Sequence, residues 1–360
     1  MTSLPLHSLD SALLEQAVSL LDDSWLTTDP DIAGSVERVL ARGVGQDWHK
    51  AGTLRHHLQG VARTLTAWKQ PRHVRLLGLM HSVYGNDYVD FVKFDPVSER
   101  QQLAAITGDR AEALIHLFCT MSRTRFVQQL VRNEIEPDGS VILPTGQGNS
   151  LIIAPDDVAA FIVVTLADMF EQWYSWQDDI YAQYPDFAPQ SAQVHWAASL
   201  WPGPMRPTSF LLSLLACLRS RLERPGLAGR LPDIPVLAGA QLTAANEAAA
   251  VSLYWSVVQN DQPLTHPAAA IGALEQSVAL NPWVAEPQFV LAQLYLSQQQ
   301  FDQALAVAHS GLQLASAWGN AWDKRVSWEG WLAWGRVLAD YAARKEWPDR
   351  LDRLNNVALR

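Results

Sequence analysis

Apolar residues recur at helical spacing along most of the chain, and short polar or proline-containing breaks separate the periodic segments. This pattern predicts helices over residues 9–25, 31–42, 51–69, 72–82, 109–122, 158–183 and 209–222. The stretch 133–155 differs, because its apolar residues alternate and glycine-containing turns lie at 137–139 and 146–148. Alternation between turns of this kind predicts a short β-hairpin. We therefore expect an all-α chain with one small β-hairpin.

The chain also divides into two predicted domains. Glycines and prolines gather between Pro225 and Pro235, which is typical of a domain boundary. We expect a first helical domain over 1–230, which contains the hairpin as an insertion, and a second helical domain over 236–350.

The second domain carries a weak internal repeat. Ala270 and Ala304 are 34 residues apart, at positions where tightly packed helices need a small side chain, and Gly335 beside tryptophans repeats the pairing of small and large residues after an insertion. This pattern resembles the tetratricopeptide repeat over roughly 265–345. The resemblance implies a degenerate stack of antiparallel helices whose concave face binds a protein or peptide partner. An ordinary antiparallel helical bundle is the alternative.

Five tryptophans lie between residues 318 and 334. Trp328, Trp331 and Trp334 follow one another at a spacing of three, so they share roughly one face of a helix. We expect their rings to fill the core in place of leucine, and an exposed interface is the alternative.

Composition narrows the classes of function. The 360 residues are 48% hydrophobic, which is ample for two cores and argues against disorder. The net charge of −10 and the lack of a dense Lys/Arg run argue against nucleic-acid binding. No apolar stretch reaches the ~18 residues of a membrane span, and no signal peptide is visible. With only two cysteines, we expect a soluble cytoplasmic protein with no nucleic-acid or membrane partner.

Candidate chemistry is concentrated in the first domain. His57 lies on a predicted helix, His81 follows 24 residues later on the next helix, and Asp168 lies within the long helix predicted over 158–183. Side chains from three helices can converge inside an all-helical domain. Imidazole and carboxylate ligands suit Zn, Fe or Mn, and three protein ligands leave positions open for water or substrate.

The same residues resemble a known family. The order is His57, then Gly78-Leu79-Met80-His81, then Ala167-Asp168. It is similar to the His-Asp (HD) superfamily of metal-dependent phosphohydrolases and of diiron oxygenases of the myo-inositol oxygenase type. The His-Ser-Val-Tyr-Gly sequence at 81–85 resembles an uncharacterised bacterial branch of it more closely. The resemblance covers roughly residues 40–180 and implies that His57, His81 and Asp168 are metal ligands.

One residue departs from the family pattern. The aspartate that follows the second histidine in the family bridges two metal ions, whereas Ser82 stands at that position here. A serine hydroxyl supplies neither the charge nor the second oxygen, so we expect one divalent ion, Fe, Zn or Mn, and a small-molecule substrate. A two-histidine, one-carboxylate site serves hydrolysis by activating water and, with iron, activation of O2. We place hydrolysis first, a non-heme iron oxygenase second, and a metal-free protein-binding module third.

Further residues complete the predicted site. His56 is the alternative ligand to its neighbour, because adjacent helical residues point about 100° apart. Glu112 and His116 are four residues apart, which permits a supplementary ligand pair or a surface hydrogen bond. Tyr84 and Glu171 are candidate catalytic residues, the first lining the pocket and the second supporting the ligands. Each histidine has the alternative of a hydrogen-bonded core residue. Four basic residues are candidate contacts for an anionic substrate: Lys93, Arg100, Arg123 and Arg125.

Overall fold

The computed structural model describes residues 11–19, 28–49, 52–87, 92–146, 148–172, 211–239, 242–258 and 266–347. The chain forms two compact units. The N-terminal unit comprises residues 19–172 and 214–241, and the C-terminal unit comprises 1–18, 173–213 and 242–360. The domain limits expected from the sequence, 1–230 and 236–350, remain a prediction.

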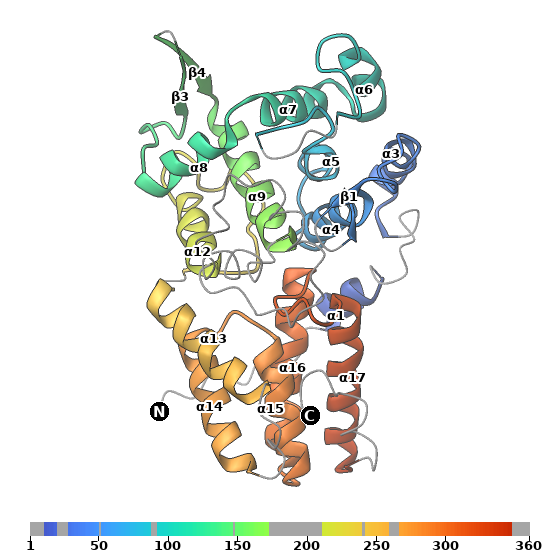
Figure 1. Ribbon diagram of the computed structural model, residues 1–360, viewed down its shortest axis with the longest axis vertical. Helices are drawn as coiled ribbons and strands as arrows, with labels where there is room; N and C mark the ends of the chain where they lie inside the picture. The colour runs from blue at the N-terminus through green and yellow to red at the C-terminus, as the bar shows by residue number, and fades with distance from the viewer. Residues whose placement is uncertain are drawn as a thin grey trace, which may run out of the picture. The chain divides into compact units, whose positions relative to one another are not determined.

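The N-terminal unit is mostly helical, with two small antiparallel hairpins (Figure 1). Its helices are α3 (Pro30–Leu40), α4 (Leu54–Ala67), α5 (Arg72–Met80), α6 (Arg100–Thr107), α7 (Asp109–Thr120), α8 (Arg123–Arg132), α9 (Pro155–Gln172) and, from Leu214 onward, α12 (Leu211–Arg221). Strand β1 (Trp48–His49) pairs with β2 (Gly52–Thr53), and β3 (Val141–Gly146) pairs with β4 (Asn149–Ile153).

The prediction of a mostly helical chain with a small hairpin at 133–155 is confirmed. Helices α6 and α8 and the pairing of β1 with β2 were not expected. Helix α8 buries only Arg123, Phe126 and Leu130, so its periodic signal is too short to stand out. Residues 173–183 of the predicted long helix lie outside the described residues.

Helices α4, α5 and α9 form the centre of the N-terminal unit. Helix α9 is buried without interruption from Val158 to Asp168, so it is a core helix rather than a surface one. Helices α4 and α5 touch at Gly78, where a Cβ atom would lie 2.1 Å from Leu65 Cδ1. Glycine at this position lets the helix that carries His81 lie directly against the helix that carries His57.

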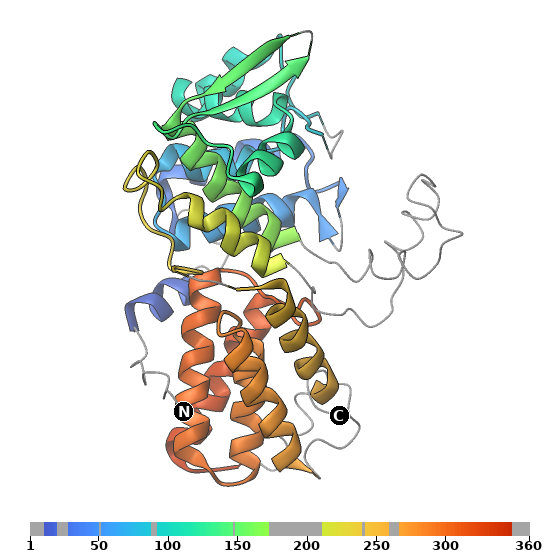
Figure 2. The ribbon, with the colours of Figure 1, turned by 90° about the vertical axis from the view of Figure 1, so that its left-hand side faces the viewer.

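The C-terminal unit is a series of adjacent helices (Figures 1 and 2). They are α13 (Ala244–Val258), α14 (Pro267–Leu280), α15 (Glu286–Ser297), α16 (Phe301–Trp318) and α17 (Trp328–Arg344), with most of α1 (Ser11–Ser19) assigned to the same unit. Each helix from α13 to α17 contacts the next, and α15 also contacts α17.

Phe289 of α15 fills the space between three helices. A Cβ atom on Gly311 of α16 or on Gly335 of α17 would lie 2.6 Å or 2.3 Å from its ring. The ring also stacks on Trp331, with centroids 6.0 Å apart. Trp318, Trp322, Trp328 and Trp331 are all buried, which confirms their prediction as core residues, while Trp334 is partly exposed.

Buried polar groups tie α15 to the segment that precedes α17. The backbone N–H groups of Trp322 and Asp323 donate to Glu286 Oε1 at 2.7 and 3.1 Å. Burial, followed by the charge of Asp323, raises the pKa of Glu286 to about 7. The Tyr254 hydroxyl donates to Asp323 Oδ2 at 2.6 Å.

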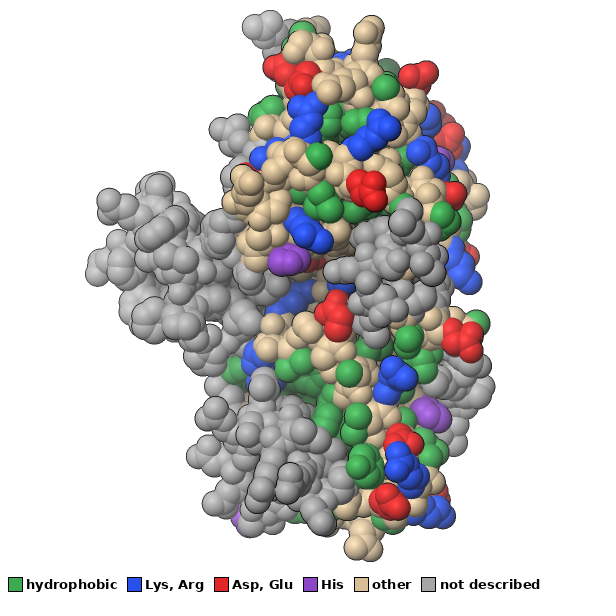
Figure 3. Space-filling view, turned by 90° about the vertical axis from the view of Figure 1, so that its right-hand side faces the viewer, with side chains coloured by type: hydrophobic (Ala, Val, Ile, Leu, Met, Phe, Trp, Pro, Cys, Tyr) green, Lys and Arg blue, Asp and Glu red, His purple; other side chains and the backbone are tan. Residues whose placement is uncertain are grey.

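None of the described helices combines the length and the apolar character that crossing a membrane requires. On the face shown in Figure 3, the described basic and acidic side chains are interspersed and form no continuous patch of one sign.

Candidate metal centre

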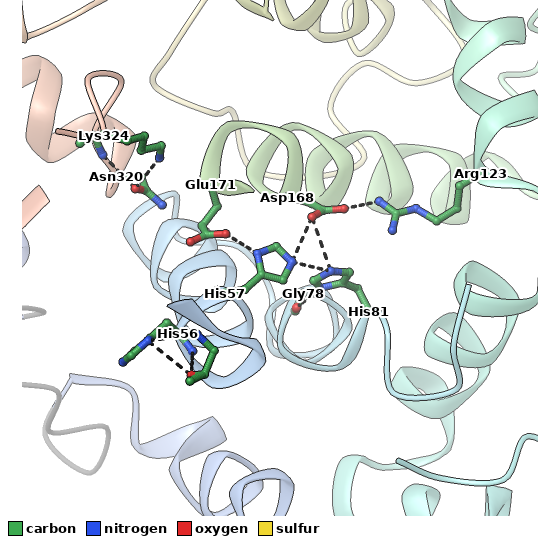
Figure 4. Close-up of polar contacts among 11 residues, drawn as sticks. His56, His57, Gly78, His81, Arg123, Asp168, Glu171, Asn320 and Lys324 are labelled. Carbon is green, nitrogen blue, oxygen red and sulfur yellow. Dashed lines mark hydrogen bonds and ion pairs between the residues drawn. The ribbon is translucent and has the colours of Figure 1, made fainter. Parts of the chain in front are cut away.

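Three side chains predicted to bind metal converge in the core of the N-terminal unit (Figure 4). His57 comes from α4, His81 follows the last turn of α5, and Asp168 comes from α9. His57 Nε2 lies 3.1 Å from His81 Nε2 and 3.3 Å from Asp168 Oδ1, and His81 Nε2 lies 3.5 Å from the same oxygen. All three side chains are buried.

A backbone carbonyl fixes the orientation of the His81 ring. His81 Nδ1 lies 2.7 Å from the carbonyl oxygen of Gly78. That oxygen can only accept, so Nδ1 carries the proton and the lone pair of the neutral ring lies on Nε2. The Cys119 thiol donates to the His81 carbonyl at 3.2 Å. Its pKa is raised to about 12 by burial, so this thiol does not ionise near neutral pH.

Glu171 fixes the His57 ring in the same way. Its carboxylate accepts a hydrogen bond from His57 Nδ1, so the lone pair of the neutral His57 ring also lies on Nε2. A Cβ atom on Gly60, one helical turn after His57, would lie 2.8 Å from Glu171 Cγ. Glycine at position 60 therefore leaves the space that Glu171 occupies.

Arg123 leaves one oxygen of Asp168 facing the two imidazoles. The guanidinium of Arg123 forms an ion pair with Asp168 Oδ2 and lies over the ring of Phe118, 4.5 Å from its centroid. Asp168 Oδ1 is buried and lies 3.3 Å from His57 Nε2 and 3.5 Å from His81 Nε2.

Three lone pairs therefore face one another across a few ångströms. When both histidines are neutral, these lone pairs belong to Nε2 of His57, Nε2 of His81 and Oδ1 of Asp168. A buried acceptor without a partner costs about 1–3 kcal/mol. A proton between two of these atoms would leave the third unsatisfied, whereas a metal ion would bind all three.

The ionisation of the three groups follows from their contacts. Burial alone would raise the pKa of Asp168, but Arg123 and the two histidines hold it well below its usual value. Burial lowers the pKa of His81 to about 4, despite the nearby Asp168. Burial would also lower the pKa of His57, but the charges of Glu171 and Asp168 and their hydrogen bonds outweigh it and raise that pKa to about 9. Without a metal ion, His57 thus binds the proton that balances the two carboxylates.

The three ligand atoms fit a single ion. Two ligands of one ion, with bonds of about 2.0–2.2 Å, lie about 3.0–3.5 Å apart at octahedral or tetrahedral angles. The observed separations are 3.1, 3.3 and 3.5 Å. Metal-ligating histidines usually donate the other ring N–H to a carboxylate or a carbonyl, as His57 and His81 do here.

A third imidazole adjoins this group. His49 of β1 packs on His57 with ring centroids 4.7 Å apart and an interplanar angle of 39°. Its side chain is buried, and its Nε2 atom has no partner among the described residues. Burial and the neighbouring His57 lower the pKa of His49 to about 4.

The other predicted site residues make different contacts. His56 caps the start of α4 with Thr53, and its side chain is exposed. The Tyr84 hydroxyl donates to Glu112 Oε1 at 3.0 Å, and the Tyr84 ring meets His116 edge to face. These residues are not among the described side chains that the structure brings together as a ligand group.

The four basic residues predicted to contact substrate all have partners within the protein. Arg100 holds both oxygens of Glu112 at 2.7 and 2.8 Å. Lys93 pairs with Asp47, Arg123 with Asp168, and Arg125 donates to the Pro144 carbonyl.

Sequence reasoning missed His49, and it expected a metal ion or an arginine as the partner of Asp168 without identifying Arg123. Neither has a local signal, because both depend on how distant segments meet. Gly60 and Gly78 did carry a signal, since glycine inside a helix costs about 1 kcal/mol relative to alanine and often marks a close contact.

Comparison with known proteins adds one similarity. Residues 38–123 match a family model described as a domain of unknown function, DUF6817. The matched segment contains His49, His57, His81 and Arg123 and ends before α9, which carries Asp168. No curated protein and no solved structure matches the chain.

Proposed function

We propose that the N-terminal unit is an HD-like domain that binds one divalent metal ion and hydrolyses a small substrate. The observation that carries this proposal is the convergence of Nε2 of His57, Nε2 of His81 and Oδ1 of Asp168 at separations of 3.1–3.5 Å. An ion held by such ligands would polarise a substrate oxygen and lower the pKa of bound water to about 7.

Each protein group has a defined task in this proposal. His57, His81 and Asp168 would hold the ion. Glu171 and the Gly78 carbonyl keep the two Nε2 lone pairs directed inward. Arg123 occupies Oδ2 of the aspartate and leaves Oδ1 for the ion. The burial of the three ligands excludes bulk water and strengthens their electrostatic interactions.

The charges also favour a divalent ion. Asp168 and Glu171 carry two negative charges and Arg123 carries one positive charge, so the group has a net charge of about −1 when both histidines are neutral. A divalent cation reverses this charge, and that arrangement attracts an anionic or strongly polar ligand to the remaining coordination positions.

We place hydrolysis ahead of oxygenation because hydrolysis needs only water as its co-reactant. Activation of O2 at a single iron needs O2 itself and electrons from the organic substrate or from a reductant. A non-heme iron oxygenase remains the second proposal, because two histidines and one carboxylate also suit iron.

Metal analysis of the full chain without a histidine tag tests the proposal. We expect about one equivalent of Zn, Fe or Mn per chain after loading and dialysis, and its loss in His81→Ala and Asp168→Asn. The matched control is His56→Gln, because His56 is an exposed histidine of α4, the helix that carries His57. Glutamine suits this position, since His56 is the third residue of the helix and part of its capping box. No bound ion in the wild-type protein, or equal binding by His81→Ala, would refute the metal centre. A colour change of the iron-loaded protein on exposure to O2 would select the oxygenase.

We also propose that the C-terminal unit is a degenerate tetratricopeptide-like stack. Three features support this: the stepwise packing of α13 to α17, the burial of Ala270 and Ala304, and the contact of Gly335 with Phe289. Binding of a protein or peptide partner through this unit remains a prediction.

A further inference from the structure

His49 belongs to a different kind of secondary-structure element from the other two imidazoles of the site. It lies on the short strand β1, whereas His57 and His81 belong to the helices and turn that build the core. Its side chain is only 9% exposed. It is not a member of the group of ligand atoms that lie within 4.8 Å of one another, so it stands beside the proposed ion rather than on it.

The His49 ring packs on His57, with ring centroids 4.7 Å apart. Its Nε2 atom is buried and has no hydrogen-bond partner among the described residues.

A buried ring nitrogen needs a hydrogen-bond partner, since leaving it unsatisfied costs free energy. The ring that packs on it, His57, belongs to the proposed centre. A small ligand at an open coordination position of the ion is therefore a candidate partner for this nitrogen.

We propose that His49 Nε2 hydrogen-bonds the ligand bound at the open position of the ion, either water or an oxygen or nitrogen atom of a small anionic substrate. This inference rests on the proposed metal centre. It makes His49 a residue that contacts substrate.

A neutral imidazole suits both kinds of ligand. If Nδ1 carries the proton, Nε2 accepts a hydrogen bond from water. If Nε2 carries the proton, it donates to an anion.

Azide binding to the Co²⁺-loaded full chain tests this role without knowledge of the substrate. Azide takes an exchangeable coordination position, and the visible spectrum of Co²⁺ reports both the ion and its exogenous ligand. We expect His49→Ala to bind Co²⁺ with wild-type stoichiometry and affinity but azide about tenfold more weakly, the value of one lost hydrogen bond of about 1.4 kcal/mol. His49→Gln, which keeps a donor, should recover part of the azide affinity, and the control His56→Gln should change neither value.

Unchanged azide affinity in His49→Ala would overturn the inference and leave the metal centre intact. A loss of Co²⁺ binding as large as that of His81→Ala would also overturn it, because His49 would then be a ligand or a structural support. Absence of Co²⁺ binding in the wild-type protein would refute the proposed function and this inference together.

Discussion

Gly60→Ala changes the packing around the proposed metal centre without removing a polar group. The new Cβ atom would lie 2.8 Å from Glu171 Cγ and 3.1 Å from Oε1, whereas carbon atoms in ordinary contact are about 3.5–4.0 Å apart. Glu171 must therefore retreat by about 1 Å, a displacement that breaks a hydrogen bond of normal length. The lost bond is the one that orients His57.

Loss of such a supporting bond typically lowers metal affinity about 10–100-fold, which is about 1.4–2.8 kcal/mol. The assay is Zn²⁺ titration of the ion-free protein by calorimetry, with urea unfolding of the same samples. Gly34→Ala is the matched control, since Gly34 lies in α3 with no atom within 4 Å of the new Cβ. It should raise stability by about 1 kcal/mol and leave Zn²⁺ affinity unchanged.

A double mutant decides whether Glu171 carries the effect. Glu171→Ala alone should weaken Zn²⁺ binding by a similar factor, and adding Gly60→Ala to it should cost little more, because the clash is gone. The reasoning fails if Gly60→Ala binds Zn²⁺ within threefold of wild type. It also fails if the fold-losses in Zn²⁺ affinity of the two single variants multiply in the double variant.

Three further predictions concern stability. Arg123→Met should destabilise the ion-free protein by about 3–5 kcal/mol in urea unfolding, because it leaves the buried Asp168 carboxylate without its ion-pair partner, and saturating Zn²⁺ should restore part of the loss. Glu286 has a pKa of about 7 in the folded protein, against 4.5 for the free side chain. Its protonated form therefore contributes its full stabilisation below about pH 4.5. This contribution to the free energy of unfolding, up to about 3 kcal/mol, is lost as the pH rises through 7. Glu286→Gln should remove that pH dependence and be more stable than wild type at pH 8 by tryptophan-monitored unfolding. Gly335→Ala would place a Cβ atom 2.3 Å from Phe289 Cε1 and should cost about 1–3 kcal/mol by overpacking, with Phe289→Leu recovering part of it.

Each of these has an outcome that contradicts it. If Zn²⁺ leaves the stability of Arg123→Met unchanged, Asp168 is not a ligand of the ion. A pH dependence that persists in Glu286→Gln would assign it to another group. For Gly335→Ala, the control is Gly272→Ala in α14, which has no atom within 4 Å and should be stabilised, so equal behaviour of the two variants would remove the role of Phe289.

Local pattern was sufficient for most of the secondary structure. The periodic segments at 51–69, 72–82 and 109–122 are helices α4, α5 and α7, and the alternating segment at 133–155 contains β3 and β4. These elements are long or regular enough for their own residues to decide them. Helix α8 and the two-residue strands β1 and β2 are too short for that, so their neighbours decide them.

The candidate site is likewise decided partly by the sequence and partly by the tertiary structure. The resemblance of the order His57, His81 and Asp168 to the His-Asp superfamily predicted that these residues meet, and the structure brings them together. Only the tertiary structure decided which atoms face inward. Glu171 reaches His57 across 114 residues of sequence, and Arg123 reaches Asp168 across 45.

Those contacts depend on how closely α4, α5 and α9 approach one another, and Gly60 and Gly78 permit that approach. The tertiary structure also brought His49 to the site, through a strand that the sequence did not predict. The sequence by itself thus determined which three residues meet and the helical segments that carry them. The packing determined the direction of each lone pair, because the direction of a ring depends on atoms from helices distant in the chain.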